Sequence, residues 1–169
     1  MTNVRSLVQE YDHSDYLGEL VDFPEQVREG VRRGRELDLE SSSYDRVLVC
    51  GMGGSAITGD LLSQFLFYRS DVPIVTNRFY RVPGWVDERT LTVVVSYSGN
   101  TEETLSACED ALRCGSECLA VTSNGELSEI ARSEGMKVVD VPEGIPPRAA
   151  AAYLFLPLIF ALEDVAGYE

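Results

Sequence analysis

Two short segments of the sequence combine glycine with hydroxyl side chains. Residues 51–55 read Gly-Met-Gly-Gly-Ser, and residues 96–101 read Ser-Tyr-Ser-Gly-Asn-Thr. Glycine lets the backbone approach a ligand closely, and the first N–H groups of a helix attract an anion. Hydroxyl groups and backbone amides can bind phosphate without a lysine. The two segments together therefore predict a phosphate site, whereas either one alone would equally fit a tight turn or a helix cap.

Each segment follows a run of apolar, β-branched residues that is typical of a buried strand. Strands are expected near residues 46–50, 73–77, 91–96, 117–122 and 137–141, with helices between them and a last helix from about residue 147. This order predicts an α/β fold, namely a doubly wound, five-stranded parallel sheet in the flavodoxin-like order, flanked by helices. Ligands of such sheets bind beyond the carboxyl ends of the strands, so both glycine-containing segments should lie on one edge.

The chain is expected to divide into a helical extension, residues 1–44, and a single α/β domain, residues 45–169. Residues 15–40 have a helical pattern whose apolar side carries Leu17, Leu20, Val21, Val27 and Val31. The stretch Ala149–Leu162 is apolar almost all round, and one face of a sheet cannot cover all of it. We therefore expect the protein to form a homodimer; the alternative is that residues 15–40 cover this helix within one subunit.

The charge and the apolar content of the chain argue against several classes of partner. The formal net charge is −14, which disfavours binding to nucleic acid. The longest apolar stretch is too short to span a bilayer. The first residues are polar and acidic, unlike a secretory segment, so a cytoplasmic protein without membrane contact is expected. The cysteines and the single histidine, His13, lack the spacing of a metal site, and neither a metal nor a cofactor is expected.

The first glycine segment also fits a dinucleotide-binding fingerprint. Gly51, Gly53 and Ala56 match the pattern G-x-G-x-x-A. The acidic residue expected at the end of the next strand is missing, because residues 76–78 read Thr-Asn-Arg. An arginine at that place could meet the 2′-phosphate of NADP. NADP binding therefore stays as an alternative, although it assigns no role to residues 96–101.

Three motifs carry a resemblance to a known family. They are GMGGSAITGD at residues 51–60, SYSGNTEET at residues 96–104 and PPRAAAAY at residues 146–153. These motifs resemble those of sugar isomerase (SIS) domains. Their combination resembles the amino-terminal half of archaeal-type bifunctional phosphoglucose/phosphomannose isomerases, and the resemblance runs from about residue 15 to the end of the chain. It implies a SIS-type fold and a hexose 6-phosphate as the ligand.

The resemblance also implies roles for individual residues. The residues that should contact the substrate phosphate are Gly53, Gly54, Ser55, Ser96, Ser98 and Thr101. Arg148 matches an arginine that the family places beside the reacting carbons. The base glutamate, the ring-opening histidine and a lysine of the family belong to a second SIS domain, so a homodimer or a partner carrying such a domain is expected. Within this sequence Glu143, close to Arg148, is the candidate base.

Aldose–ketose isomerisation moves a proton between C1 and C2 of a sugar through an enediolate. It needs a base for that proton and a positive group near the developing oxyanion. The resemblance implies that the chain interconverts glucose 6-phosphate or mannose 6-phosphate with fructose 6-phosphate, or forms the phosphate-binding half of such an isomerase. A non-catalytic phosphosugar sensor, as SIS domains are in some transcription regulators, is the main alternative.

Overall fold

The structure, a computed structural model, describes residues 4–39 and 44–168. At its centre lies a parallel sheet of five strands in the order β2-β1-β3-β4-β5, which confirms the doubly wound, flavodoxin-like prediction. The strands are β1 (Arg46–Gly51), β2 (Ile74–Asn77), β3 (Thr90–Val95), β4 (Glu117–Thr122) and β5 (Lys137–Asp140). The helices after β1 are α4 (Gly53–Leu66), α5 (Glu102–Arg113), α6 (Glu126–Ser133), α7 (Ala151–Ala161) and α8 (Glu163–Ala166).

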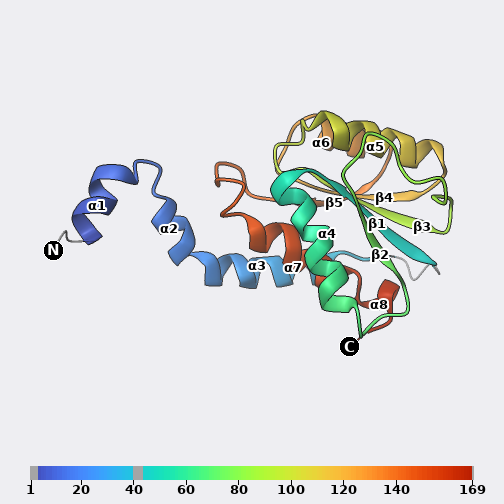
Figure 1. The fold of residues 1–169 in the computed structure, drawn as a ribbon, viewed down its shortest axis with the longest axis horizontal. Coiled ribbons are helices and arrows are strands. Elements are labelled where there is room, and N and C mark those ends of the chain that lie inside the picture. Colours follow the sequence, from blue (N-terminus) through green and yellow to red (C-terminus); the bar gives the residue numbers. More distant parts are fainter. Residues whose placement is uncertain (1–3, 40–43, 169) are drawn as a thin grey trace.

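Helices cover both faces of the sheet, with α4 and α7 on one face and α5 and α6 on the other (Figure 1). Successive side chains of a strand point to opposite faces, so β1 contributes to both layers. Val47 and Val49 join the core cluster that contains Leu62 of α4. Leu48 and Cys50 pack with Ala107 of α5. Burial on both faces explains why the strands read as continuous apolar runs in the sequence.

The last helix begins later than expected. It starts at Ala151 instead of near residue 147. The backbone N–H groups of Ala149 and Ala150 both donate to the carbonyl oxygen of Pro146, which closes an isolated turn before the helix. Ala150 then has φ −84° and ψ 11°, outside helical geometry, and this interruption separates the turn from α7. The Pro146–Arg148 segment is therefore part of a loop and not the first turn of a helix.

Three further helices precede the sheet: α1 (Val4–Tyr11), α2 (Tyr16–Val21) and α3 (Phe23–Glu36). α3 packs along α7. A Cβ atom at Gly34 would lie 2.4 Å from the carbonyl oxygen of Pro157, and one at Gly30 would lie 3.1 Å from that of Ala152. The two glycines therefore let the helix backbones approach closely. As a result α3 covers one side of the apolar helix α7 within the same chain.

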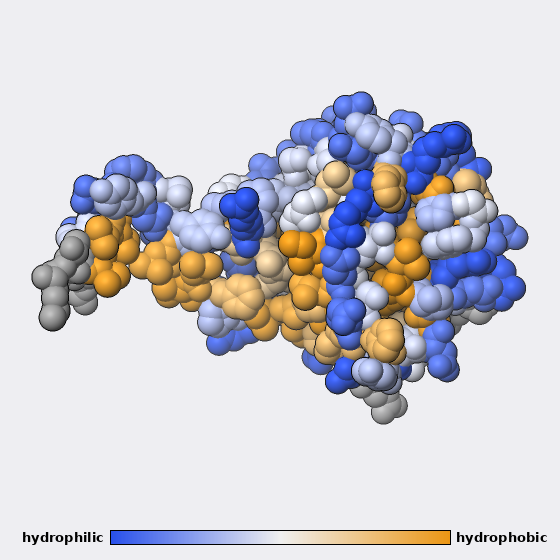
Figure 2. Space-filling model, in the orientation of Figure 1, coloured by the Kyte–Doolittle hydropathy of each residue, from blue (hydrophilic) through white to orange (hydrophobic). Residues whose placement is uncertain are grey.

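α1 and α2 form an arm that extends away from the α/β body, past the end of α7 (Figure 1). Leu17, Leu20 and Val21 of α2, which belong to the apolar side expected for residues 15–40, are 46%, 48% and 68% exposed. The arm lies beyond the helices that could bury these residues. Figure 2 shows an apolar band along the arm that continues onto the body. Within the described residues, no helix is long and apolar enough to cross a membrane.

Candidate functional site

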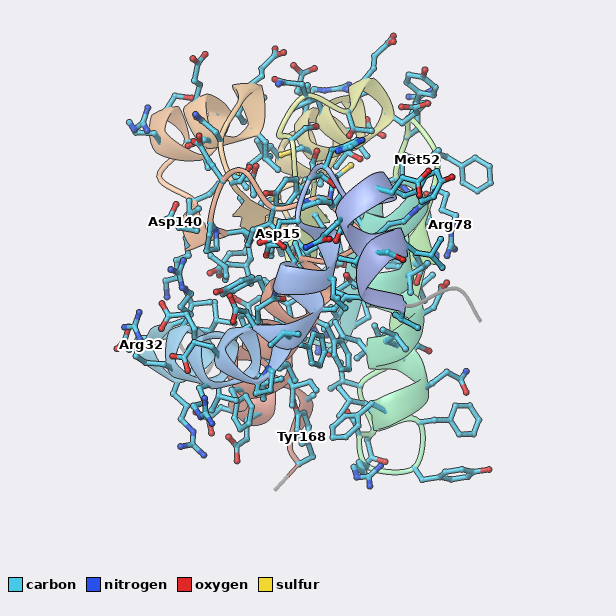
Figure 3. The ribbon with its side chains drawn as sticks, turned by 90° about the vertical axis from the view of Figure 1, so that its left-hand side faces the viewer. Asp15, Arg32, Met52, Arg78, Asp140 and Tyr168 are labelled. Carbon is cyan, nitrogen blue, oxygen red and sulfur yellow. The ribbon has the colours of Figure 1, made fainter. Side chains whose placement is uncertain are left out.

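Strand register places the two glycine-containing turns next to each other. β1 and β3 are neighbours in the sheet, and Gly51 at the end of β1 pairs with Val95 at the end of β3. The first turn, residues 51–55, and the second turn, residues 96–101, therefore leave the same edge of the sheet from adjacent strands. Figure 3 looks at this edge, with Met52 and Arg78 on one side and Asp140, the last residue of β5, on the other.

The first turn leads directly into α4. Gly53 has φ +53°, a conformation that favours glycine, and a Cβ at Gly53 or Gly54 would meet no atom within 4 Å. Both glycines are exposed, and Met52, the N-cap residue, makes no side-chain capping bond. The beginning of α4 is therefore open, and its positive end faces the space beside Ser55, which is half-buried.

The second turn is anchored to β4, to the loop after it and to the beginning of α6. A Cβ at Gly99 would lie 1.7 Å from the carbonyl oxygen of Asn124, so no other residue fits there. The backbone N–H of Ser96 donates to the carbonyl oxygen of Val121 over 3.0 Å, and that of Leu127 donates to the carbonyl oxygen of Gly99 over 2.9 Å. These contacts hold the turn at Ser96 and at Gly99, and Ser98 between them is exposed.

The hydroxyl groups of the second turn are arranged at different depths. Ser96 is 1% exposed, and its Oγ lies 3.0 Å from Oγ1 of Thr101, which is half-buried. Ser98 is exposed, and its Oγ accepts a bond of 3.3 Å from the N–H of Asn100. The pair at the base and the exposed serine at the rim leave hydroxyl donors available to an anion.

Arg148 lies beside the first turn. It lines a cavity of about 430 Å³ together with Gly54, Ile57, Thr58, Leu61, Pro147, Ala151, Leu154 and Phe155. Its side chain is exposed and, within the described residues, has neither an ion pair nor a hydrogen bond. Because the guanidinium has no partner among the described residues, it is free to bind an anionic group at the edge of this mostly apolar cavity.

Glu143 does not line this cavity. Its side chain is exposed, and Oε1 accepts a hydrogen bond of 2.8 Å from Nδ2 of Asn124. The carboxylate is therefore directed toward the loop after β4. The structure brings Arg148 next to Gly54 of the first turn. Glu143 precedes Arg148 in the loop after β5 but lies outside the cavity.

Two residues near the site have contacts that the sequence does not predict. Tyr97, within the second turn, accepts a bond of 2.9 Å from the N–H of Ile145 at its hydroxyl group and donates one of 3.0 Å to the carbonyl oxygen of Pro142. Burial raises the pKa of this tyrosine, so the hydroxyl stays protonated. Asn124 binds Glu143 as described. An aromatic residue between two serines was the available signal for Tyr97, whereas nothing in the sequence distinguished Asn124.

Arg78, the residue that could meet a 2′-phosphate of NADP, is already paired. It donates a hydrogen bond to Asp60 of α4, and the two form an ion pair. A dinucleotide phosphate would have to displace this carboxylate. The geometry therefore weakens the NADP interpretation of the first turn.

Comparison with known proteins gives consistent results, although no protein-family model matches the chain. The chain is 42% identical over 139 residues to the bifunctional phosphoglucose/phosphomannose isomerase of Caldicellulosiruptor bescii. The aligned residues cover 81% of this chain and 41% of that protein. It is 36% identical over 124 residues to the D-glucosamine-6-phosphate 4-epimerase of Sulfolobus acidocaldarius, covering 73% of this chain and 39% of that protein.

The fold also matches solved structures. A crystal structure of a protein assigned as a phosphosugar isomerase from Clostridium difficile 630 has a TM-score of 0.74 at 20% identity, over 89% of this chain and 45% of that one. The chain spans about two fifths of the length of the two curated relatives named above. Its sequence is similar to part of the bifunctional phosphoglucose/phosphomannose isomerases, and its fold is that of the Clostridium difficile structure.

Proposed function

We propose that the chain binds the phosphate of a hexose 6-phosphate between its two turns. The observation that carries this proposal is the pairing of Gly51 with Val95, which sets the open beginning of α4 beside the hydroxyl groups of Ser96 and Thr101. Gly53, Gly54 and Ser55 would bind from one side, and Ser96, Ser98 and Thr101 from the other. A helix N-terminus and several hydroxyl groups together supply enough donors for a phosphate without lysine.

We infer further that the chain acts in the interconversion of glucose 6-phosphate or mannose 6-phosphate with fructose 6-phosphate. Arg148 borders the cavity next to Gly54, so it could contact the sugar while the phosphate stays between the turns. There it would stabilise the negative charge of the enediolate. The sequence relatives support a phosphosugar ligand. One is named as an isomerase and the other as an epimerase, and both names contain a phosphosugar although the reactions differ.

The base for the C1–C2 proton is the missing part of this mechanism. Glu143 lies outside the cavity and binds Asn124. We propose that a second SIS domain, on another copy or on a partner chain, completes the site. The greater length of the relatives supports this, since most of each relative has no counterpart in the chain.

Calorimetric titration tests the binding proposal. Glucose 6-phosphate and fructose 6-phosphate should bind, while glucose and NADP should not. Binding of NADP in place of the sugar phosphates would overturn the proposal. Turnover of fructose 6-phosphate then separates the isomerase from a phosphosugar sensor, which would bind the same ligands without converting them.

A further inference from the structure

Tyr97 joins the second turn to the loop that carries Glu143 and Arg148. Its hydroxyl donates to the carbonyl oxygen of Pro142 over 3.0 Å and accepts from the N–H of Ile145 over 2.9 Å. In an ordinary β-turn those two backbone groups would bond to each other. Here one side-chain hydroxyl from another part of the chain bonds to both of them.

The tyrosine is itself fixed at its other end. Its carbonyl oxygen accepts bonds from the N–H of Ser123 over 3.0 Å and from the hydroxyl of Ser123 over 2.6 Å. Its ring packs against the main core cluster. Because the backbone and the ring of Tyr97 are both held, a displacement of residues 96–98 would move the hydroxyl directly.

The loop held by Tyr97 has few other attachments. Gly144 has φ +83°, and a Cβ there would meet no atom within 4 Å. Glu143 and Gly144 are exposed, as are Pro147 and Arg148. Among the described residues, the bond between Asn124 and Glu143 is the other side-chain hydrogen bond to this loop. A loop with exposed residues and few contacts opens readily unless such bonds hold it.

We propose that Tyr97 is a positioning residue that transmits phosphate binding at the second turn to the loop of residues 142–148 and thereby places Arg148. Phosphate bound to Ser96 and Ser98 immobilises the turn on both sides of Tyr97. The hydroxyl of Tyr97 then holds Pro142 and Ile145 in one arrangement, and Arg148 follows three residues later. This inference rests on the phosphate site proposed above, and it adds a coupling between two segments that are separate in the sequence.

The test compares the protein with its Tyr97→Phe variant, which keeps the ring and removes only the hydroxyl. Tyr168→Phe is the matched control, because its half-buried hydroxyl donates to the carbonyl oxygen of Ile159 at the opposite end of α7. Calorimetry measures the Kd for inorganic phosphate and for fructose 6-phosphate. Hydrogen exchange with and without fructose 6-phosphate measures protection of the Ala149 amide, which follows Arg148 and donates to Pro146 and not to Tyr97.

In the unmodified protein and in the Tyr168→Phe control, fructose 6-phosphate should slow exchange at Ala149 by roughly tenfold or more. In Tyr97→Phe the Kd for inorganic phosphate should stay within about twofold, since the phosphate donors remain, while the slowing at Ala149 is lost. This split between affinity and loop protection would not arise from a general loss of stability.

Three outcomes would contradict the proposal, and they are distinguishable. If the unmodified protein binds neither phosphate compound, the proposed phosphate site is wrong and the coupling falls with it. If it binds both but exchange at Ala149 does not change, the site stands and the coupling is wrong. If Tyr97→Phe loses phosphate affinity as well, Tyr97 builds the turn and does not transmit its occupancy.

Discussion

Ser98 is the hydroxyl of the second turn whose removal disturbs the protein least. It is exposed, and within the described residues its side chain makes one hydrogen bond, accepted from the N–H of Asn100 over 3.3 Å, whereas Ser96 is buried against Thr101. Ser98→Ala should weaken hexose 6-phosphate binding by roughly 1–3 kcal/mol, because a charged acceptor loses one donor. Calorimetry measures the effect. Ser133→Ala, an exposed serine at the end of α6, is the control and should leave affinity unchanged. Equal affinities for all three proteins would remove Ser98 from the site.

Arg148 is the residue that best separates binding from catalysis. A positive charge just before the beginning of α7 is opposed by the helix dipole, and no acidic partner offsets it among the described residues. A bound anionic intermediate would supply the compensation. Arg148→Ala should therefore lower kcat by roughly 100-fold with KM little changed, because the lost interaction forms mainly in the transition state.

The assay for Arg148→Ala follows turnover of fructose 6-phosphate, with a second SIS domain added in trans if the chain alone is inactive. Arg132→Ala on α6, an exposed arginine remote from the two turns in sequence, controls for the loss of charge. A rise in KM at constant kcat would make Arg148 a binding residue and would refute its proposed role at the enediolate.

At the scale of elements, contact between α3 and α7 depends on glycine. A Cβ at Gly34 would lie 2.4 Å from the carbonyl oxygen of Pro157 and 2.9 Å from Cβ of Phe160. Alanine normally favours a helix over glycine by about 1 kcal/mol. Gly34→Ala should nevertheless destabilise the protein by roughly 1–3 kcal/mol, since the helices must separate or distort.

Urea denaturation measures this change. Gly30→Ala serves as a graded comparison, because its nearest contacts of 3.1 Å leave room for a small adjustment, and it should cost less than Gly34→Ala. Unchanged or increased stability of Gly34→Ala would mean that the two helices are not packed as closely as the structure shows.

At the scale of the whole molecule, the apolar surface is larger than a single chain can cover. Because α3 already packs on α7, the prediction of a partner now depends on the exposed apolar side chains of the arm and of α4. Exposed apolar side chains there include Leu7, Leu17, Leu20, Val21, Phe23, Ile57, Leu61 and Phe65. An apolar band of this extent is typical of an interface (Figure 2).

We therefore expect self-association as a dimer at tens of micromolar, measured by sedimentation equilibrium. Leu20→Lys should shift the equilibrium toward monomer, because it places a charge on the apolar band. Gln9→Lys on α1 makes the same change of charge at an exposed polar position and should leave the dimer intact. A strictly monomeric unmodified protein would contradict the prediction and leave a partner chain with a second SIS domain as the expected occupant.

The sequence by itself determined the sheet, and it predicted an anion site at the edge of that sheet. Continuous apolar runs such as Leu91–Val95 can be buried only between two helical layers, and their order along the chain leads to the flavodoxin-like arrangement. The glycine and hydroxyl composition of residues 51–55 and 96–101 predicts an anion site without reference to geometry, because these properties are local.

Other features depended on tertiary contacts that no local pattern encodes. α7 starts only at Ala151 because the N–H groups of Ala149 and Ala150 both bond to the carbonyl oxygen of Pro146. The exposure of Leu20 depended on where α2 ends relative to α7, and the separation of Glu143 from the cavity depended on a bond to Asn124, 19 positions away. The link between Tyr97 and Ile145 spans 48 positions. Such pairs are chosen by the packing of the whole chain, so only the tertiary structure could decide them.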